Sequence, residues 1–303
     1  MRALVAYFLL LGATKFGGPI ALAGAMQRDL VDDRKWITPE EYLRGLALAQ
    51  LAPGPLAAQL AIYIGWVRGG LAGATLVGVA FVLPSFVMVL ALSWLYVHFH
   101  GLSWMQAVFY GVGAAVIGIV ARSVVKLARL TLARDALLWV LFAVSAVVTA
   151  VTEREIIWLF LGCGIVAVAV RMLPRAATAA SLALLPLYAP LARGIRGVAP
   201  VDTLLRIGIY FAEAGAFVFG SGLAVVPFLY GGVVERYRWL TEREFLDAVA
   251  IAMITPGPVV ITVGFIGYLT AGPLGATIAA AAVFLPCYLF VVVLAPHYER
   301  WAE

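Results

Sequence analysis

Long apolar stretches, nearly free of charged side chains, dominate this sequence and leave few folds open to it. Hydrophobic residues make up 64% of the 303 residues and charged residues only 12%, where a soluble domain has about 25%. A soluble fold of this length cannot bury so much apolar surface, whereas a lipid bilayer accommodates it. The sequence therefore predicts an all-α, polytopic membrane protein whose main surroundings are the lipid bilayer.

The charged and reactive residues exclude several other classes of protein. The net charge is +5, but the basic residues lie in short clusters between apolar stretches, as they do in cytoplasmic loops. This arrangement predicts membrane topology and no nucleic-acid partner. The two cysteines have no partner at metal-ligand spacing, and no nucleophile–base pattern or phosphate-binding loop occurs. We expect no enzyme activity, no cofactor and no metal.

An internal repeat relates the two ends of the sequence. A shift of 203 residues matches residues 16–55 to residues 219–258 without a gap, and a shift of 202 extends the match to residues 84 and 286. The matched positions include Trp36 with Trp239 and the Pro-Gly-Pro motifs at 53–55 and 256–258. Shared hydrophobicity does not align rare Trp and Pro positions over about 70 residues, and such repeats are typical of transporters.

The start of each copy has the same pattern. A long apolar stretch, residues 3–26 or 204–234, is interrupted by Phe-Gly-Gly-Pro or by Phe-Gly-Ser-Gly. We expect a short polar loop after it, ending at Trp36 or Trp239, because tryptophan is typical of the headgroup level.

Two short helices are predicted next in each copy. Thr-x-x-Glu capping boxes start helices at Thr38 and Thr241, and Pro-Gly-Pro stops them near Ala52 and Thr255. New apolar segments follow, and each piece has some 11–14 residues, fewer than the roughly 20 that cross a bilayer. The pattern predicts helical hairpins or broken helices, whose irregular backbone is tolerated only beside protein or a watery cavity.

We divide the chain into a first repeat with extra spans at 1–175, a connecting segment at 176–202 and a shorter second repeat at 203–303. Full spans are expected at 71–97, 105–121, 136–152, 156–173 and 273–295. If residues 176–191 cross the membrane, the copies are parallel; if they do not, the copies are inverted. The positive-inside rule puts residues 28–44 and 122–134 in the cytoplasm in both cases, so it does not choose between them.

The motifs together resemble those of the chromate ion transporter family over nearly the whole chain. In the first half the resemblance lies in Phe16-Gly-Gly-Pro19, Arg34-Lys35-Trp36, Leu46-Ala47-Leu48-Ala49-Gln50, Pro53-Gly54-Pro55 and Leu83-Pro84-Ser85. In the second half it lies in Phe219-Gly-Ser-Gly222, residues 239–245, Thr255-Pro256-Gly257-Pro258 and Phe284-Leu-Pro286.

This resemblance implies export of chromate from the bacterial cytoplasm through the inner membrane, driven by the proton motive force, with two inverted halves. A sulfate carrier, another oxyanion carrier and a non-transporting membrane subunit are the alternatives. Leu22 stands where many members carry a His, so coupling through that His is not available here. Two-domain members usually run longer, which leaves open whether a partner, such as a second copy in a homodimer, completes the shorter half.

Helix starts are the predicted binding sites for a tetrahedral oxyanion, because each offers free amides and about half a positive charge. The helices after Pro55 and Pro258 would point such starts at the midplane, although Pro-Gly-Pro could instead be only a bend for packing. The substrate-binding candidates near the breaks are Gly17, Gly18, Gln50, Pro53, Gly54, Pro55, Gln59, Gly220, Ser221, Thr255, Pro256, Gly257 and Pro258.

Two ionisable residues lie inside apolar stretches, where such residues are usually functional. Lys15 is a candidate partner for the dianion; alternatively it snorkels to an interface or pairs with Glu213. Glu213 is a candidate for proton coupling, because burial favours the protonated carboxyl group; alternatively it is a neutral, hydrogen-bonded core residue.

Overall fold

The structure is a computed structural model that describes residues 1–15, 19–99, 111, 135–152, 163, 200–217, 219–220 and 225–302. The chain forms two compact units, Met1–Val116 with Ala189–Glu303, and Ile117–Tyr188. The second unit contains α6 (Ala136–Thr152), an apolar helix whose first turn is capped by the Asp135 carboxylate. The predicted span at 136–152 coincides with α6, while those at 105–121 and 156–173 lie outside the described residues, as does the segment 176–191.

In the residues that the structure describes, the larger unit contains two similar series of elements, whose regular structure is helical apart from one two-residue strand pair. The first series is α1 (Arg2–Thr14), α2 (Pro19–Met26), η1 (Gln27–Asp33), α3 (Pro39–Leu51), β1 (Gly54–Pro55) and α4 (Leu56–Phe99). The second is α8 (Val201–Phe217), β2 (Phe219–Gly220), α9 (Val225–Tyr230), η3 (Gly231–Arg236), α10 (Glu242–Ile254), η4 (Val259–Ile261) and α11 (Thr262–Ala302).

The predicted short helices are confirmed. Both capping boxes form, with Thr38 and Thr241 at the N-caps of α3 and α10. These helices end at Ala52 and Thr255, where the backbone turns extended before each Pro-Gly-Pro motif. Non-helical residues at Gly69–Gly70 and Ala271–Gly272 divide α4 and α11 into a short first arm and a long second arm. The second arms, residues 71–99 and 273–302, contain the predicted spans at 71–97 and 273–295.

The predicted polar loops before Trp36 and Trp239 are wrong, because most of each segment is π-helical and continues the preceding helix. In η1 and η3 the chain forms bonds of the i→i−5 type, from Arg34 N–H to Asp29 O (3.2 Å) and from Tyr237 N–H to Gly232 O (2.8 Å). Wide turns of this kind satisfy backbone groups that a loop would leave to water. Each π-helix is followed by a residue with φ of 51°, Lys35 or Arg238.

Helices that are neighbours in the sequence pair as hairpins. The Tyr7 hydroxyl of α1 donates to Asp29 of η1 (3.2 Å), so α1 runs back along α2 and η1. In the second series, the Tyr210 hydroxyl of α8 donates to the Phe228 carbonyl of α9 (2.6 Å). Gly45 of α3 packs against the Tyr63 ring of α4, on opposite sides of the Pro-Gly-Pro turn. Of the two predicted alternatives, α3 and the first arm of α4 therefore form a helical hairpin.

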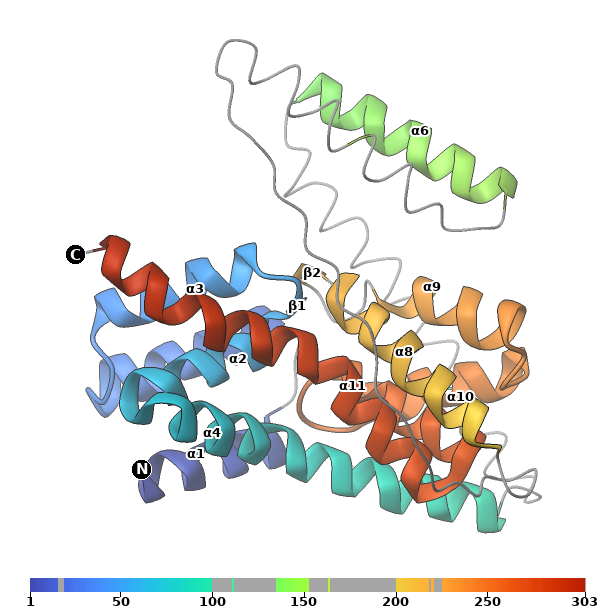
Figure 1. Cartoon of the computed structure of the whole chain (residues 1–303), viewed down its shortest axis with the longest axis horizontal. Coiled ribbons are helices and arrows are strands. Elements are labelled where there is room, and N and C mark those ends of the chain that lie inside the picture. The colour runs from blue at the N-terminus through green and yellow to red at the C-terminus, as the bar shows by residue number, and fades with distance from the viewer. Residues whose placement is uncertain are drawn as a thin grey trace. The chain divides into compact units, whose positions relative to one another are not determined.

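The two long second arms run antiparallel to one another. Thr75, near the start of the arm in α4, shares a hydrogen bond with Tyr288 of α11 (2.6 Å). Tyr96, near the end of that arm, packs on Phe265 in the first arm of α11, and this first arm folds back onto the start of the second arm, where Gly267 contacts Gly275. In Figure 1, α4 ends at one side of the larger unit while α11 returns to the side of the N-terminus.

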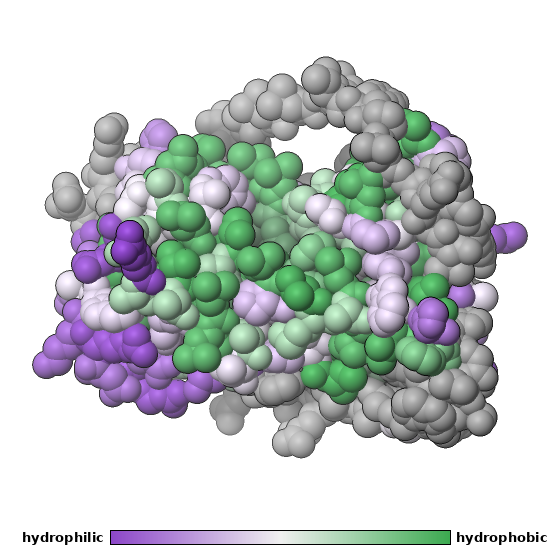
Figure 2. Space-filling model, turned by 90° about the horizontal axis from the view of Figure 1, so that it is seen from below, coloured by the Kyte–Doolittle hydropathy of each residue, from purple (hydrophilic) through white to green (hydrophobic). Residues whose placement is uncertain are grey.

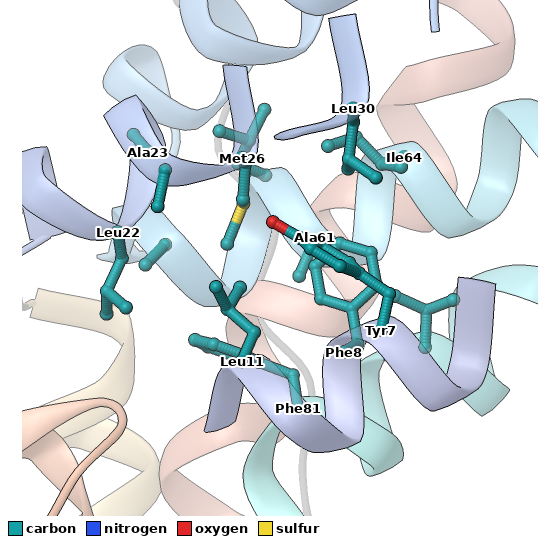
Figure 3. Close-up of a cluster of buried hydrophobic side chains, with 14 of the residues drawn as sticks. Tyr7, Phe8, Leu11, Leu22, Ala23, Met26, Leu30, Ala61, Ile64 and Phe81 are labelled. Atoms are coloured by element: carbon teal, nitrogen blue, oxygen red, sulfur yellow. The ribbon is translucent and has the colours of Figure 1, made fainter. Parts of the chain in front are cut away.

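Apolar side chains fill the space between these helices and also cover part of the outside. Figure 3 shows side chains of α1, α2, η1 and both arms of α4 meeting in one cluster. On the outer face of α4, apolar side chains recur at helical spacing and are about half exposed, namely Leu76, Val79, Leu83 and Val87. Figure 2 shows a broad hydrophobic area with hydrophilic residues gathered at one end. Such a surface fits lipid and not water.

Two helices in the described part of the chain are long and apolar enough to cross a membrane, judged by length and composition. They are Leu56–Phe99 and Val259–His297, and each includes the break between its two arms.

Candidate functional site at the two helix breaks

The two Pro-Gly-Pro motifs make tight turns that only glycine fits. Gly54 and Gly257 have φ of 130° and 104°, which side-chain-bearing residues rarely adopt. A Cβ on Gly54 would overlap Cys287 of α11, and a Cβ on Gly257 would overlap Ser85 of α4. Each break therefore packs against the middle of the long arm that belongs to the other copy.

Backbone hydrogen bonds also join each break to the other copy. Gly54 and Pro55 form a parallel pair with Phe219 and Gly220, which is the strand pair β1–β2 (Figure 1). The Gly257 N–H donates to the Lys15 carbonyl at the end of α1 (3.2 Å). The Gly257 amide is therefore occupied by protein and is not free to bind a ligand in this conformation.

A small pocket of about 10 Å³, enough for about one water molecule, lies between the two breaks. Its lining comes from the starts of three helices: α2, α4, and η4 with the α11 that follows it. The lining residues are Pro19, Leu22, Pro55, Ala57, Gly257, Pro258, Val259 and Val260. The first amides of a helix have no partner within the helix, and its dipole makes that end positive. Three such ends around one pocket form an environment that favours an anion.

The structure brings most of the predicted binding residues to this region. Pro55, Gly257 and Pro258 line the pocket, and Gly220 pairs with Pro55. Gly54, Gln59, Thr255 and Pro256 are buried beside the breaks and Pro53 is half-buried. The Thr255 hydroxyl donates to Ile251 O of its own helix (2.7 Å). Gln50 is exposed on α3, and Gly17, Gly18 and Ser221 lie outside the described residues.

The two ionisable candidates are both exposed on the surface of the chain. Lys15 follows α1 at the tip of the first hairpin, and its side chain does not enter the protein core. Glu213 lies on α8, one turn before the end of that helix. Among the described residues no ion pair joins Lys15 to Glu213.

Sequence reasoning missed a buried carboxylate on α10. Asp247 is 8% exposed, and its carboxylate accepts a hydrogen bond from the Tyr96 hydroxyl at the end of α4 (2.8 Å). Asp247 lies six residues after the Thr241 cap, at the start of a run of α10, residues 247–252, that is buried on all sides. The repeat contained an indication of this residue. Arg44 occupies the matching position of the first copy, so the charge at this position is positive in one copy and negative in the other.

Comparisons with known proteins agree with one another. The sequence profile described as chromate transporter matches residues 2–168 and 205–303. A chromate transport protein of Cupriavidus metallidurans is 60% identical over 100% of this chain and 76% of its own length. A probable chromate transport protein of Synechococcus elongatus is 54% identical over 99% of this chain and 77% of its own length. One from Pseudomonas aeruginosa is 33% identical over 99% and 74%. No solved structure matches the chain.

Proposed function

The chain belongs to the chromate transporter family, and from that premise we propose that it is a secondary transporter which exports chromate through the bacterial inner membrane. Similar proteins of Cupriavidus metallidurans and Pseudomonas aeruginosa carry the name chromate transport protein. The sequence has no phosphate-binding loop for a nucleotide. The driving force would therefore be an ion gradient or the membrane potential.

The pocket at which three helix starts meet is the observation that carries this proposal. Chromate is a tetrahedral oxyanion that loses its water shell on entering the membrane, at a cost of tens of kcal/mol in hydrocarbon. Helix dipoles and first-turn amides at the starts of α2, α4 and η4 would offset this cost without a full protein charge. The apolar lining excludes water, which strengthens each of these interactions.

We further propose that the two copies are inverted repeats and that both breaks lie near the bilayer midplane. The antiparallel second arms of α4 and α11 support inversion, because matched segments of parallel copies would run the same way. Gly54 packs against Cys287 and Gly257 packs against Ser85, and both contacts lie in the middle of those long arms. This packing supports a position of both breaks near the bilayer midplane. Movement of one copy against the other would then open the pocket to each side in turn.

The proposal gives Lys15 and Glu213 separate roles. Lys15 attracts the anion to the hairpin tip, since its backbone carbonyl already bonds the second break and its ammonium group stays exposed. Glu213 exchanges protons with an aqueous path, for which its exposed carboxyl group is suited. Neither role requires the two side chains to touch.

Flux through vesicles that contain the purified full chain tests the function. We expect faster chromate movement than in empty vesicles, stimulation by an imposed pH gradient, and inhibition by sulfate. Faster movement of sulfate than of chromate would favour the oxyanion alternative. No movement of either anion, in vesicles whose protein is shown to be folded, would refute transport.

A further inference from the structure

Gln59 carries a buried hydrogen-bond acceptor that nothing in the described structure satisfies. Its side chain is fully buried in the first turn of α4 and folds back over the break. Nε2 donates to the carbonyls of Ala52 (3.3 Å) and Pro53 (2.6 Å). Both partners are acceptors, so the nitrogen must face them and the amide orientation is determined. Oε1 is then left without a donor among the described residues.

Among the described residues, an unsatisfied buried side-chain oxygen occurs at the first break and not at the second. A buried acceptor without a donor costs about 1–3 kcal/mol, so a purely structural residue would avoid it. In the corresponding stretch of the second copy, Thr262 donates its hydroxyl proton to Val259 O (2.7 Å) within its own helix. Within the described part of the chain, Gln59 Oε1 is the buried side-chain atom that lacks a partner.

The position of this oxygen connects it to the pocket. A Cβ on Gly54 would lie 2.6 Å from Gln59 Nε2, so the amide directly backs the turn. Pro55, the next residue, lines the pocket. Gln59 itself is not part of that lining, so contact between its amide and an anion would require the first break to move away from Cys287 of α11. Oε1 is thus a buried acceptor next to the turn whose following residue, Pro55, lines the pocket.

We propose that Gln59 Oε1 accepts a hydrogen bond from the proton of a singly protonated oxyanion and so determines the specificity of the site. This inference rests on the proposed transport of chromate. Chromate takes up its first proton near neutral pH, whereas sulfate and selenate remain fully ionised until strongly acidic conditions. An acceptor such as Oε1 repels a fully ionised oxyanion, which has no proton to donate. It stabilises a protonated oxyanion, because the hydrogen bond satisfies both the buried oxygen and the proton of the anion.

Measuring chromate and selenate transport side by side tests the proposal. Vesicles containing the full chain are assayed at mildly alkaline and mildly acidic pH, and the ratio of the two half-saturating concentrations is compared. The ratio cancels any proton coupling that acts on both anions. In the wild type we expect the preference for chromate to rise as the pH falls, following the protonated fraction of chromate.

Gln59→Met keeps the volume of the side chain and removes the acceptor. We expect it to reduce the preference for chromate over selenate at acidic pH by about 5- to 100-fold, the range that matches a satisfied buried hydrogen bond, while selenate transport persists. Gln27→Met, at an exposed position of η1, is the matched control and should leave the ratio unchanged. If Gln59→Met does not reach the membrane, Gln59→Leu, which also lacks an acceptor, replaces it.

Two outcomes overturn the proposal while the proposed function stands. A wild-type ratio that is independent of pH would mean that Oε1 bonds a fixed water or stays unsatisfied. If the chromate-to-selenate ratio of a Gln59 variant keeps the full pH dependence, another group binds the proton of the anion. Absence of transport of both anions by the folded wild type would instead refute the proposed function.

Discussion

Replacing Gly257 with alanine measures how tightly the second break is packed against the other copy. The backbone at φ of 104° strains any residue with a Cβ, which costs about 1–3 kcal/mol. The added methyl group would also overlap Ser85 Oγ, and overpacking of this kind costs about 1–3 kcal/mol more. We therefore expect Gly257→Ala to destabilise the fold by about 2–6 kcal/mol.

The two parts of this cost are separable. Ser85→Ala removes the overlapped oxygen, so the double variant should recover the packing part and leave the backbone part. Gly24→Ala is the control, since Gly24 lies exposed on α2 with no atom near its Cβ, and helix propensity predicts a gain of up to about 1 kcal/mol. The assay is the fraction of folded protein after graded heating in detergent, together with vesicle flux. If Gly257→Ala is as stable as the wild type, the tight packing of the break is refuted. If the double variant is no more stable than Gly257→Ala, the overlap with Ser85 is refuted.

The other predictions concern charge, protons, the buried pair and access. Lys15→Ala should abolish chromate flux at normal abundance while Lys15→Arg retains part of it; normal flux in the alanine variant would make the cation structural. Glu213→Gln should bind anion yet lose stimulation by a pH gradient, and equal stimulation in both proteins would remove Glu213 from the mechanism. Tyr96→Phe should destabilise the fold by about 1–3 kcal/mol through loss of the bond to a buried carboxylate, with unchanged heat resistance as the contrary result. In a background without the other cysteine, Cys287 should resist thiol reagents at rest because it is fully buried, and rapid labelling of resting protein would contradict this packing.

The sequence by itself determined the membrane environment and the boundaries of the short helices. Thr38 and Thr241 start α3 and α10, and Pro-Gly-Pro ends them, because caps and prolines act on backbone groups within a few residues. The repeat predicted which segments match, and the matched kinks at Gly70 and Gly272 follow from glycine at positive φ. The π-helices escaped prediction because polar residues at a membrane edge are compatible with both a loop and a wide helical turn.

Only the tertiary structure decided which polar groups meet and which are buried. Glu213 and Asp247 both lie on helices with apolar neighbours, yet Glu213 is exposed and Asp247 is buried against Tyr96. The bond from Gly257 to Lys15 joins residues more than 200 positions apart. The helical period gives the face on which a side chain lies, whereas the neighbour of that face depends on how the two copies fold together. Contacts between the copies therefore cannot be read from either copy alone.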